Sequence, residues 1–555
     1  MERKFIITVL ILLASIGLFG LFYEYAGCLL GALSGFLFSW YILFEKKAKF
    51  FLNPNSILFT IWIASYGIVS LYAVDRGMAF LGFLKMMAVF FFVGIAMQMD
   101  KEQRELLLKA APMSACATVL LGTAGYFIWP IHNFFYKAER LGGFFQHANV
   151  FALFCLLGIL IEAKENHSQR YLRMALLILG ISLSGSRTVF LMTVAIFFLL
   201  AIKEKKRRLP FITLALLMIA GSGVHVLLSG DIQNVEQIYS MLISSSFLRR
   251  LLFVKDGLRL LADRPFGLGY LGYYFMQPSA QTGVYSARFI HSDLLQIALD
   301  VGIIPCLLFA TMLIRSIFSK RTDFYEKLIL IVSGIHFAMD FDMEFTVMLF
   351  ILTLILDFYY GKEVEISSGG KLKFYKVLTI SLSFAMLYCG AAMAFHAFGK
   401  SDISAQMLPI YSEAKIQILQ NETDMDRAEK LAKDLTYRNP YIATAHDILA
   451  LAAYENGDYQ TMAREKEQSV DLQKYNMDVY NRYVILLSKG IEAAYAQGDN
   501  ETFQTLLSHV AGVPNKLKKV QKDTDPLAYK IKKKPNFELE ENVQEYVNSV
   551  VDIYQ

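Results

Sequence analysis

Residues 287–305, ARFIHSDLLQIALDVGIIP, place a histidine directly before a long apolar run. At its ordinary pKa an imidazole is largely neutral at pH 7, so His291 could accept a proton from a hydroxyl group as a general base. The run behind it predicts a membrane helix, and Ser292 or Asp293 is of a residue type that caps a helix N-terminus. The alternative is that His291 is an interfacial residue beside this cap and has no chemical task.

Several arginines also stand at the ends of apolar runs. They are Arg140 in RLGGFFQHANVF, Arg187 in SLSGSRTVFL, Arg264 in DRPFGLGY and Arg288 in the histidine segment. A planar guanidinium binds phosphate through two parallel hydrogen bonds, so this set predicts a phosphate or diphosphate site. Asn149 shares the segment of Arg140. Any single arginine of the set could instead only reach for lipid headgroups.

A few polar side chains stand inside or at the end of apolar runs. Lys85, in FLGFLKMMAVF, has no obvious partner in the sequence, and an intramembrane cation is a functional candidate. Gln296 and Asp300 are expected to be buried against neighbouring helices. Asp340, in DFDMEF, could orient the arginines or contact a cation, but no residue spacing fits a metal site. We therefore predict neither a metal nor another cofactor.

The composition predicts a membrane protein. Of the 555 residues 55% are hydrophobic and 19% are charged, against about 25% charged in ordinary globular domains. The mean hydropathy is +0.41. A net charge of +5 is too small to predict nucleic-acid binding. All five cysteines stand in apolar runs, so the polar segments have no disulfide or zinc framework.

Apolar runs predict an all-α, polytopic bundle of about thirteen transmembrane helices. The runs cover about 5–22, 25–44, 55–74, 78–98, 107–129, 147–162, 171–186, 188–202, 209–229, 291–314, 327–339, 345–360 and 375–395. We therefore expect a membrane domain over residues 1–395 with a long loop at 230–290. In that loop an amphipathic helix is predicted, which would lie in the headgroup plane or pack on the bundle. Its apolar stripe is Phe247, Leu251, Val254, Leu258 and Leu261.

The distribution of lysine and arginine predicts the orientation in the membrane. Loops such as EKKAK, KEKKRR and GKEVEISSGGKLKFYK alternate with the less basic YEY, SGSR and DFDME. Because basic loops face the cytoplasm, the N-terminus is predicted inside and residues 396–555 outside. His291, Arg140, Arg187 and Arg264 would then share the outer face.

Residues 396–555 form a polar segment that predicts a second, α-helical domain. Gly-Asp pairs at 457–458 and 498–499 recur in similar surroundings, and this weak repeat resembles tetratricopeptide-type helical pairs. A non-repeating helical bundle is the alternative. The basic end, NKLKKVQKDTDPLAYKIKKKPNFELEE, is expected to be a partly ordered tail.

Over roughly residues 1–395 the chain resembles the O-antigen ligase and O-antigen polymerase family of bacterial membrane glycosyltransferases. His291-Ser292, nine residues and Gly302 match its histidine signature, although Pro305 departs from the pattern. Arg187 to Leu191 matches an Arg-x-x-x-Leu element. RLGGFFQHAN and RPFGLGY look like two further segments of the family.

The resemblance implies metal-independent transfer of a glycan from undecaprenyl diphosphate to an acceptor hydroxyl, at the outer face of the bacterial cytoplasmic membrane. The acceptor would be a glycan, a lipid or the cell wall. In that reaction His291 would be the base, while Arg187 and Arg264 would stabilise the diphosphate. Further donor-binding candidates are Arg288 and Arg140, and supporting candidates are Ser292, Asp293, Asn149, Lys85 and Asp340.

Three other functions remain open from the sequence. Within the family, the protein could polymerise lipid-linked repeat units instead of ligating finished chains. A transporter could use Lys85 and Asp300, but the inverted repeats typical of many transporters are not visible. A membrane-anchored scaffold would work only through protein partners of residues 396–555, and would leave the clustered arginines unexplained.

Overall fold

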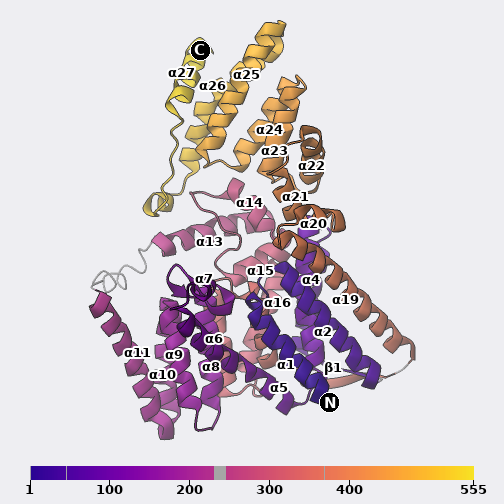
Figure 1. The fold of residues 1–555 in the computed structure, drawn as a ribbon, viewed down its shortest axis with the longest axis vertical. Coiled ribbons are helices and arrows are strands. Elements are labelled where there is room, and N and C mark those ends of the chain that lie inside the picture. Colours follow the sequence, from indigo (N-terminus) through magenta and orange to yellow (C-terminus); the bar gives the residue numbers. More distant parts are fainter. Residues whose placement is uncertain (1, 46, 230–244, 368, 555) are drawn as a thin grey trace. The chain divides into compact units, whose positions relative to one another are not determined.

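The computed structural model describes residues 2–45, 47–229, 245–367 and 369–554 (Figure 1). The chain is 77% helical, which confirms the all-α prediction. Within the described residues only two small antiparallel sheets occur. Strand β1 (Ala48–Leu52) pairs with β4 (Lys362–Ile366), and β2 (Tyr136–Lys137) pairs with β3 (Arg140–Leu141). Residues 230–244 of the predicted outer loop lie outside the described residues.

The chain forms two compact units, and each is assembled from separate segments. The first unit comprises residues 1–68, 81–239 and 291–394, and the second comprises residues 69–80, 240–290 and 395–555. The helices in or entering the first unit are α1 (Glu2–Gly17), η1 (Phe19–Leu21), α2 (Glu24–Glu45), α3 (Pro54–Val69), α4 (Arg76–Ala96), α5 (Lys101–Leu108), α6 (Ala110–Gly125), α7 (Trp129–Phe135), η2 (Gly143–Phe145), α8 (Ala148–Lys164), α9 (Arg170–Ser184), α10 (Arg187–Lys203), η3 (Lys205–Arg207), α11 (Arg208–Ser229), α15 (Asp293–Val301), α16 (Ile303–Phe318), α17 (Phe324–Phe337), η5 (Asp342–Glu344), α18 (Thr346–Ile355) and α19 (Gly369–Ala397).

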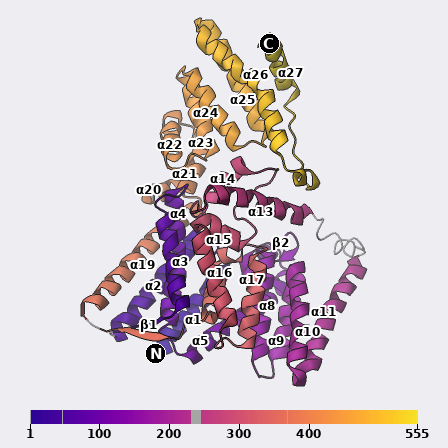
Figure 2. The same ribbon diagram turned by 180° about the vertical axis from the view of Figure 1, so that it is seen from behind.

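Helix α8 is buried within the first unit. All its residues from Val150 to Ala163 are buried, as expected for a helix that is apolar on every face. It packs against α6, α9, α10 and α17, while α1 packs against α2, α6 and α18 (Figures 1 and 2).

Four helical stretches are long and apolar enough to cross a membrane by themselves. They are Glu24–Ile42, Arg76–Ala96, Lys101–Gly125 and Gly369–Ala397. Shorter apolar helices occur at Lys4–Gly17, Pro54–Val69, Ile303–Phe318 and Thr346–Ile355. Others, such as α9 with 15 residues and α17 with 14, fall below the roughly 20 residues of a full span. Thirteen complete crossings therefore remain a prediction.

The predicted single helix at 291–314 is wrong in one respect, because the chain breaks at Gly302. Helix α15 ends at Val301 and α16 begins at Ile303, with Gly302 at φ +95° between them. Glycine is the residue that adopts such a backbone conformation without strain. Pro305, which has no N–H to donate, stands in the first turn of α16, where none is required. The departure at Pro305 thus coincides with a real break in the helix.

The second unit contains α13 and α14, which follow the undescribed segment, and the helices of residues 395–555 (Figure 2). Its helices are α13 (Ser245–Asp263), α14 (Gly272–Ala280), α20 (Ser401–Met407), α21 (Ser412–Leu419), α22 (Met425–Arg438), α23 (Ala443–Glu455), α24 (Tyr459–Leu472), α25 (Met477–Gln497), α26 (Asn500–Asp523), η6 (Pro526–Lys530) and α27 (Glu541–Tyr554). Of the basic end, residues 515–523 belong to α26 and residues 526–530 to η6, whereas residues 531–540 are outside helices and strands.

The two Gly-Asp pairs make equivalent turns between helices. Gly457 and Gly498 have φ of +73° and +70°, which ends the preceding helix. Asp458 and Asp499 then cap the next helix, because their side chains accept hydrogen bonds from the backbone N–H groups of Thr461 and Thr502. The weak repeat therefore marks two similar helical turns, and its assignment to the tetratricopeptide type remains a prediction.

Helix α13 confirms the predicted amphipathic helix, but its buried face is not the predicted stripe. Leu251 and Leu258 of that stripe are 41% and 53% exposed, whereas Leu252 and Phe253 are buried. The burial of Asp256 partly explains why this face of α13, and not the predicted stripe, is buried. Its carboxylate accepts hydrogen bonds from the backbone N–H and hydroxyl of Thr282, both at 2.8 Å.

Residues near the chain's end also contact this region of the second unit. Lys255 forms an ion pair with Asp525, and the Asp525 N–H donates to the Thr282 carbonyl at 2.9 Å. Helix α13 and η6 are consequently neighbours, although about 260 residues separate them in the sequence. Periodicity alone could not have predicted this packing, since it does not identify the partner of a helix.

Candidate functional site

His291 is paired with a buried carboxylate in the first unit. Its Nδ1 lies 2.9 Å from Oδ1 of Asp340, a side chain that is 2% exposed against 23% for the histidine. The same oxygen accepts the backbone N–H of Phe341 at 3.1 Å. For a neutral imidazole, this pairing favours the tautomer with the proton on Nδ1 and the lone pair on Nε2. A lone pair held in this way is suited to accept a proton.

A chain of hydrogen bonds extends from Asp340 to an arginine. The amide nitrogen of Asn149 donates to Oδ2 of Asp340 at 2.7 Å, and the amide oxygen of Asn149 accepts from Nη2 of Arg140 at 2.7 Å. Nε of Arg140 donates to the carbonyl of Ser184 at 2.7 Å. Hydrogen bonds thus connect four polar side chains, from His291 to Arg140, that come from four separate segments of the first unit.

Local turns position the two residues in the middle of this chain. Arg140 follows the turn of the β2–β3 hairpin, where Ala138 and Glu139 have positive φ of 48° and 58°, as in two-residue hairpin turns of type I′. Asn149 is in the first turn of α8, and His147 is the N-cap residue. The ring of His147 lies 4.8 Å from that of Phe341, and its buried Nδ1 has no hydrogen-bond partner among the residues described.

Arg187 begins α10 beside the contact of Arg140 with Ser184. Gly185, at φ +61°, closes α9, and Ser186 precedes α10. A Cβ atom on Gly185 would lie 3.5 Å from Nε of Arg140, so the turn and Arg140 are in contact. Arg187 itself is exposed. The structure therefore places Arg187 next to the end of the hydrogen-bond chain that begins at His291.

Asp293 ties the start of α15 to the segment that carries Asp340. Its two carboxylate oxygens accept the backbone N–H groups of Asp342 and Met343 at 2.9 and 3.1 Å, and its own N–H donates to the Asp340 carbonyl at 3.1 Å. Ser292 is the N-cap of α15, with a long contact of 3.5 Å from the N–H of Leu295. Asp293 is almost fully buried, so its structural part is to hold His291 and Asp340 in register.

Lys85 has partners that the sequence did not indicate. This side chain is 3% exposed, and its ammonium lies 3.3 Å from Oε2 of Glu344 and 2.9 Å from the carbonyl of Phe22. The sequence offered no obvious partner for Lys85, and its place among the supporting residues stays a prediction. Gln296 and Asp300 are buried as predicted, and the amide of Gln296 donates to the Asp300 carboxylate at 2.8 Å.

The sequence pattern did not single out His336, which pairs with an acidic residue of the DFDMEF segment. Nδ1 of His336 lies 2.5 Å from Oδ2 of Asp342, and both side chains are almost fully buried. The DFDMEF segment contains a useful signal, because its three acidic residues stand between two apolar runs. The side-chain partners of Asp340 and Glu344 come from distant segments, whereas His336 is only six residues from Asp342.

Arg264 and Arg288 belong to the second unit. Nη1 of Arg288 forms an ion pair with Oε1 of Glu413 at 2.5 Å, and its guanidinium lies 5.5 Å from the centre of the Tyr274 ring. Arg264 follows the C-terminal end of α13 and is exposed. In the part of the chain that the structure describes, no group of three or more His, Cys, Asp or Glu side chains could hold a metal ion.

Comparison with known families identifies one segment of this chain. Residues 172–310 match the O-antigen ligase family, and this segment includes Arg187, Arg264, Arg288 and His291. No curated protein matches the chain. The apolar helices agree with the match, and the resemblance seen in the sequence is confirmed over residues 172–310. The chain is thus a helical membrane protein in which one segment, residues 172–310, is similar to O-antigen ligases.

Proposed function

We propose that the protein transfers a glycan from undecaprenyl diphosphate to a hydroxyl group of an acceptor, as a polysaccharide ligase. The pairing of His291 with Asp340 at 2.9 Å is the observation that carries this proposal. A hydroxyl is a weak nucleophile at neutral pH, and a positioned base lowers the barrier to its attack. The family match supports glycan transfer in general, and the site geometry supports a base-assisted route.

In the proposed step, Nε2 of His291 removes the proton of the acceptor hydroxyl. The hydroxyl oxygen forms a bond to the anomeric carbon of the donor glycan, and the bond from that carbon to the diphosphate oxygen breaks. Undecaprenyl diphosphate leaves with the electron pair. Asp340 holds the imidazole in place and stabilises the positive charge that His291 gains, as carboxylates do in other base–carboxylate pairs.

The geometry also separates the candidate arginines by role. Two donor groups of Arg140 already bind Ser184 and Asn149, so we assign Arg140 to positioning. Arg187 is exposed at the start of α10 and is our first candidate for the diphosphate, because guanidinium groups stabilise charge on a leaving phosphate. Arg264 is exposed and stays a second candidate, while Arg288 is paired with Glu413 and comes last.

The proposed orientation puts the N-terminus in the cytoplasm and residues 396–555 outside. The alternation of basic and less basic loops supports it. Single cysteines at the exposed positions Lys205 and Glu455 can test it with a membrane-impermeant thiol reagent. Labelling of intact cells at 455 and not at 205 is expected. The reverse pattern would place the second unit in the cytoplasm, where it could not take part in transfer at the outer face.

Substitution of His291 tests the base assignment directly. The purified His291→Ala variant should transfer glycan from a lipid diphosphate donor at a rate lower by about 10²–10⁴-fold. His509→Ala is a matched control, because His509 is 25% exposed and also faces a carboxylate, at 3.5 Å from Glu467. Normal abundance with near wild-type turnover in His291→Ala would eliminate the base assignment. Product length, measured by mass spectrometry, distinguishes a ligase from a polymerase.

A further inference from the structure

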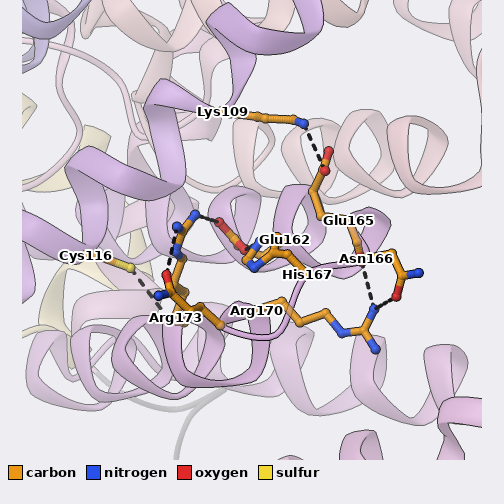
Figure 3. Close-up of polar contacts among 9 residues, drawn as sticks. Lys109, Cys116, Glu162, Glu165, Asn166, His167, Arg170 and Arg173 are labelled. Atoms are coloured by element: carbon orange, nitrogen blue, oxygen red, sulfur yellow. Dashed lines mark hydrogen bonds and ion pairs between the residues drawn. The ribbon is translucent and has the colours of Figure 1, made fainter.

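A second polar cluster in the first unit surrounds the turn between α8 and α9 (Figure 3). Glu162 is only 3% exposed, and its two oxygens lie 3.0 Å from Nη1 of Arg173 and 2.9 Å from Nε2 of His167. Beside it, Nζ of Lys109 lies 2.9 Å from Oε2 of Glu165. The reaction proposed above uses none of these residues.

A pocket of about 400 Å³ opens next to this cluster. Its walls are mainly apolar, and Lys109, Arg173, His167 and the two glutamates lie among its lining residues. The apolar walls come from α1 and from α5 and α6. They consist of Phe5, Ile6, Val9, Leu10, Leu106 and Met113. A cavity with apolar walls and charged lining groups suits an amphiphile that has an apolar chain and a charged headgroup.

The apolar walls are open at the surface of the first unit. Ile6, Leu10, Leu106 and Met113 are each between 53% and 57% exposed, which is high for large apolar side chains. In a membrane protein such a surface is covered by acyl chains, so a chain can enter the pocket from the side. The pocket thus has an open side and a chemistry that a membrane lipid would match.

Hydrogen-bond donors determine the class of headgroup. Lys109 and Arg173 line the pocket beside two carboxylates, Glu162 and Glu165, and Arg170 stands in the same turn. Arg173 has five N–H donors, of which one contacts Glu162 and one contacts Gln169 at 3.4 Å. Donors therefore remain for a phosphate. Basic pockets between membrane helices are known to bind anionic lipid headgroups.

We propose that this pocket binds one anionic phospholipid, with an acyl chain along α1 and α6 and its phosphate at Lys109 and Arg173. The segment EAKENHSQRYLR at this turn is one of the basic loops predicted on the cytoplasmic side. The lipid would accordingly come from the inner leaflet, whose anionic surface supplies it. This inference does not depend on glycan transfer, since it concerns other residues.

The experiment uses the full-length protein in detergent with a phosphatidylglycerol that carries a photoreactive group on its acyl chain. Cross-links should map to α1 and to residues 106–113. Lys109→Gln removes a headgroup contact and should lower the cross-link yield about fivefold, since Lys109 is partly exposed. Met113→Trp fills the pocket, and we expect it to lower the yield at least as much.

Two matched controls separate this site from general lipid contact. Lys205→Gln removes an exposed lysine from another basic loop, and Leu217→Trp enlarges a 62% exposed residue of α11. Both should retain the wild-type yield, and all variants should keep the wild-type thermal midpoint. Equal labelling of Lys109→Gln, Met113→Trp and the wild type would overturn the proposal. So would equal labelling by a phosphatidylcholine probe, or stronger competition by undecaprenyl phosphate than by phosphatidylglycerol.

Discussion

Two histidine–carboxylate pairs in the first unit have the same separation of 2.9 Å but different surroundings. Asp340 faces Nδ1 of His291, and Glu162 faces Nε2 of His167. Glu162 also binds the guanidinium of Arg173, whose charge compensates the carboxylate. Asp340 also accepts hydrogen bonds from two neutral groups, the Asn149 amide and the Phe341 N–H.

The comparison shows that the other groups bound to the carboxylate determine how well it can stabilise a charge on its histidine. A carboxylate held by neutral donors can stabilise a positive charge that develops on its histidine during a reaction. A carboxylate that already binds a guanidinium stabilises a positive charge on its histidine less, and its main effect is on the stability of the fold. We therefore expect neutralisation of Asp340 to lower mainly turnover and neutralisation of Glu162 to lower mainly thermal stability.

Neutralising the two carboxylates should give the largest contrast. Asp340→Asn should lower turnover by on the order of 10³-fold, because the imidazole loses both its preferred tautomer and the stabilisation of its charge. Glu162→Gln should leave turnover per folded molecule unchanged but lower the thermal midpoint, since it breaks a buried ion pair. Initial rates and thermal unfolding of both purified variants measure the contrast. Loss of turnover in Glu162→Gln at wild-type stability would contradict it.

The two arginines next to the pairing of His291 and Asp340 should differ by a smaller amount. Arg187→Lys keeps the charge and loses the bidentate geometry, so donor affinity should fall about tenfold. Arg140→Lys cannot contact Ser184 and Asn149 in the same way, and should lower kcat with little change in donor affinity. Titration with a lipid diphosphate, without added divalent metal, measures the affinities. Wild-type affinity in Arg187→Lys would remove this arginine from the phosphate site.

The smallest effect is expected in the second unit. Burial would raise the pKa of Asp525, but hydrogen bonds from Lys255 and from the N–H of Leu527 hold it below its usual range. A carboxylate with a depressed pKa contributes stability above its unfolded-state pKa of about 4, and this contribution is lost as the pH falls through the folded-state value. Lys255 is half exposed, so we expect a contribution of about 1 kcal/mol or less.

Thermal unfolding between pH 7 and pH 3 tests this expectation in the full-length protein. Asp525→Asn should lower the midpoint slightly at pH 7 and lose part of the acid sensitivity, while turnover at pH 7 stays the same. Asp499→Asn is a useful comparison, because this exposed carboxylate also has a depressed pKa but owes it to helix capping and not to an ion pair. An unchanged acid profile in Asp525→Asn would show that its pairing with Lys255 adds no stability.

Local signals in the sequence were sufficient for several features. The helical class, the amphipathic helix α13 and the helical character of residues 396–555 were predicted, because periodicity and helix caps act over a few residues. The candidate base His291 was found in the same way, from one residue at the start of an apolar run. Its role in catalysis remains a prediction that the site geometry supports.

Only the tertiary structure decided which of these residues meet. Asp340 is 49 residues from His291, and Glu344 is 259 residues from Lys85, so no local pattern indicates either pair. The buried face of α13 depends on Asp256 and on its neighbours in the second unit, and it differs from the apolar stripe, of which Leu261 is buried but Leu251 and Leu258 are exposed. The physical reason is common to all three. A periodic pattern shows that a side chain needs a partner, whereas the partner is chosen by the packing of distant segments.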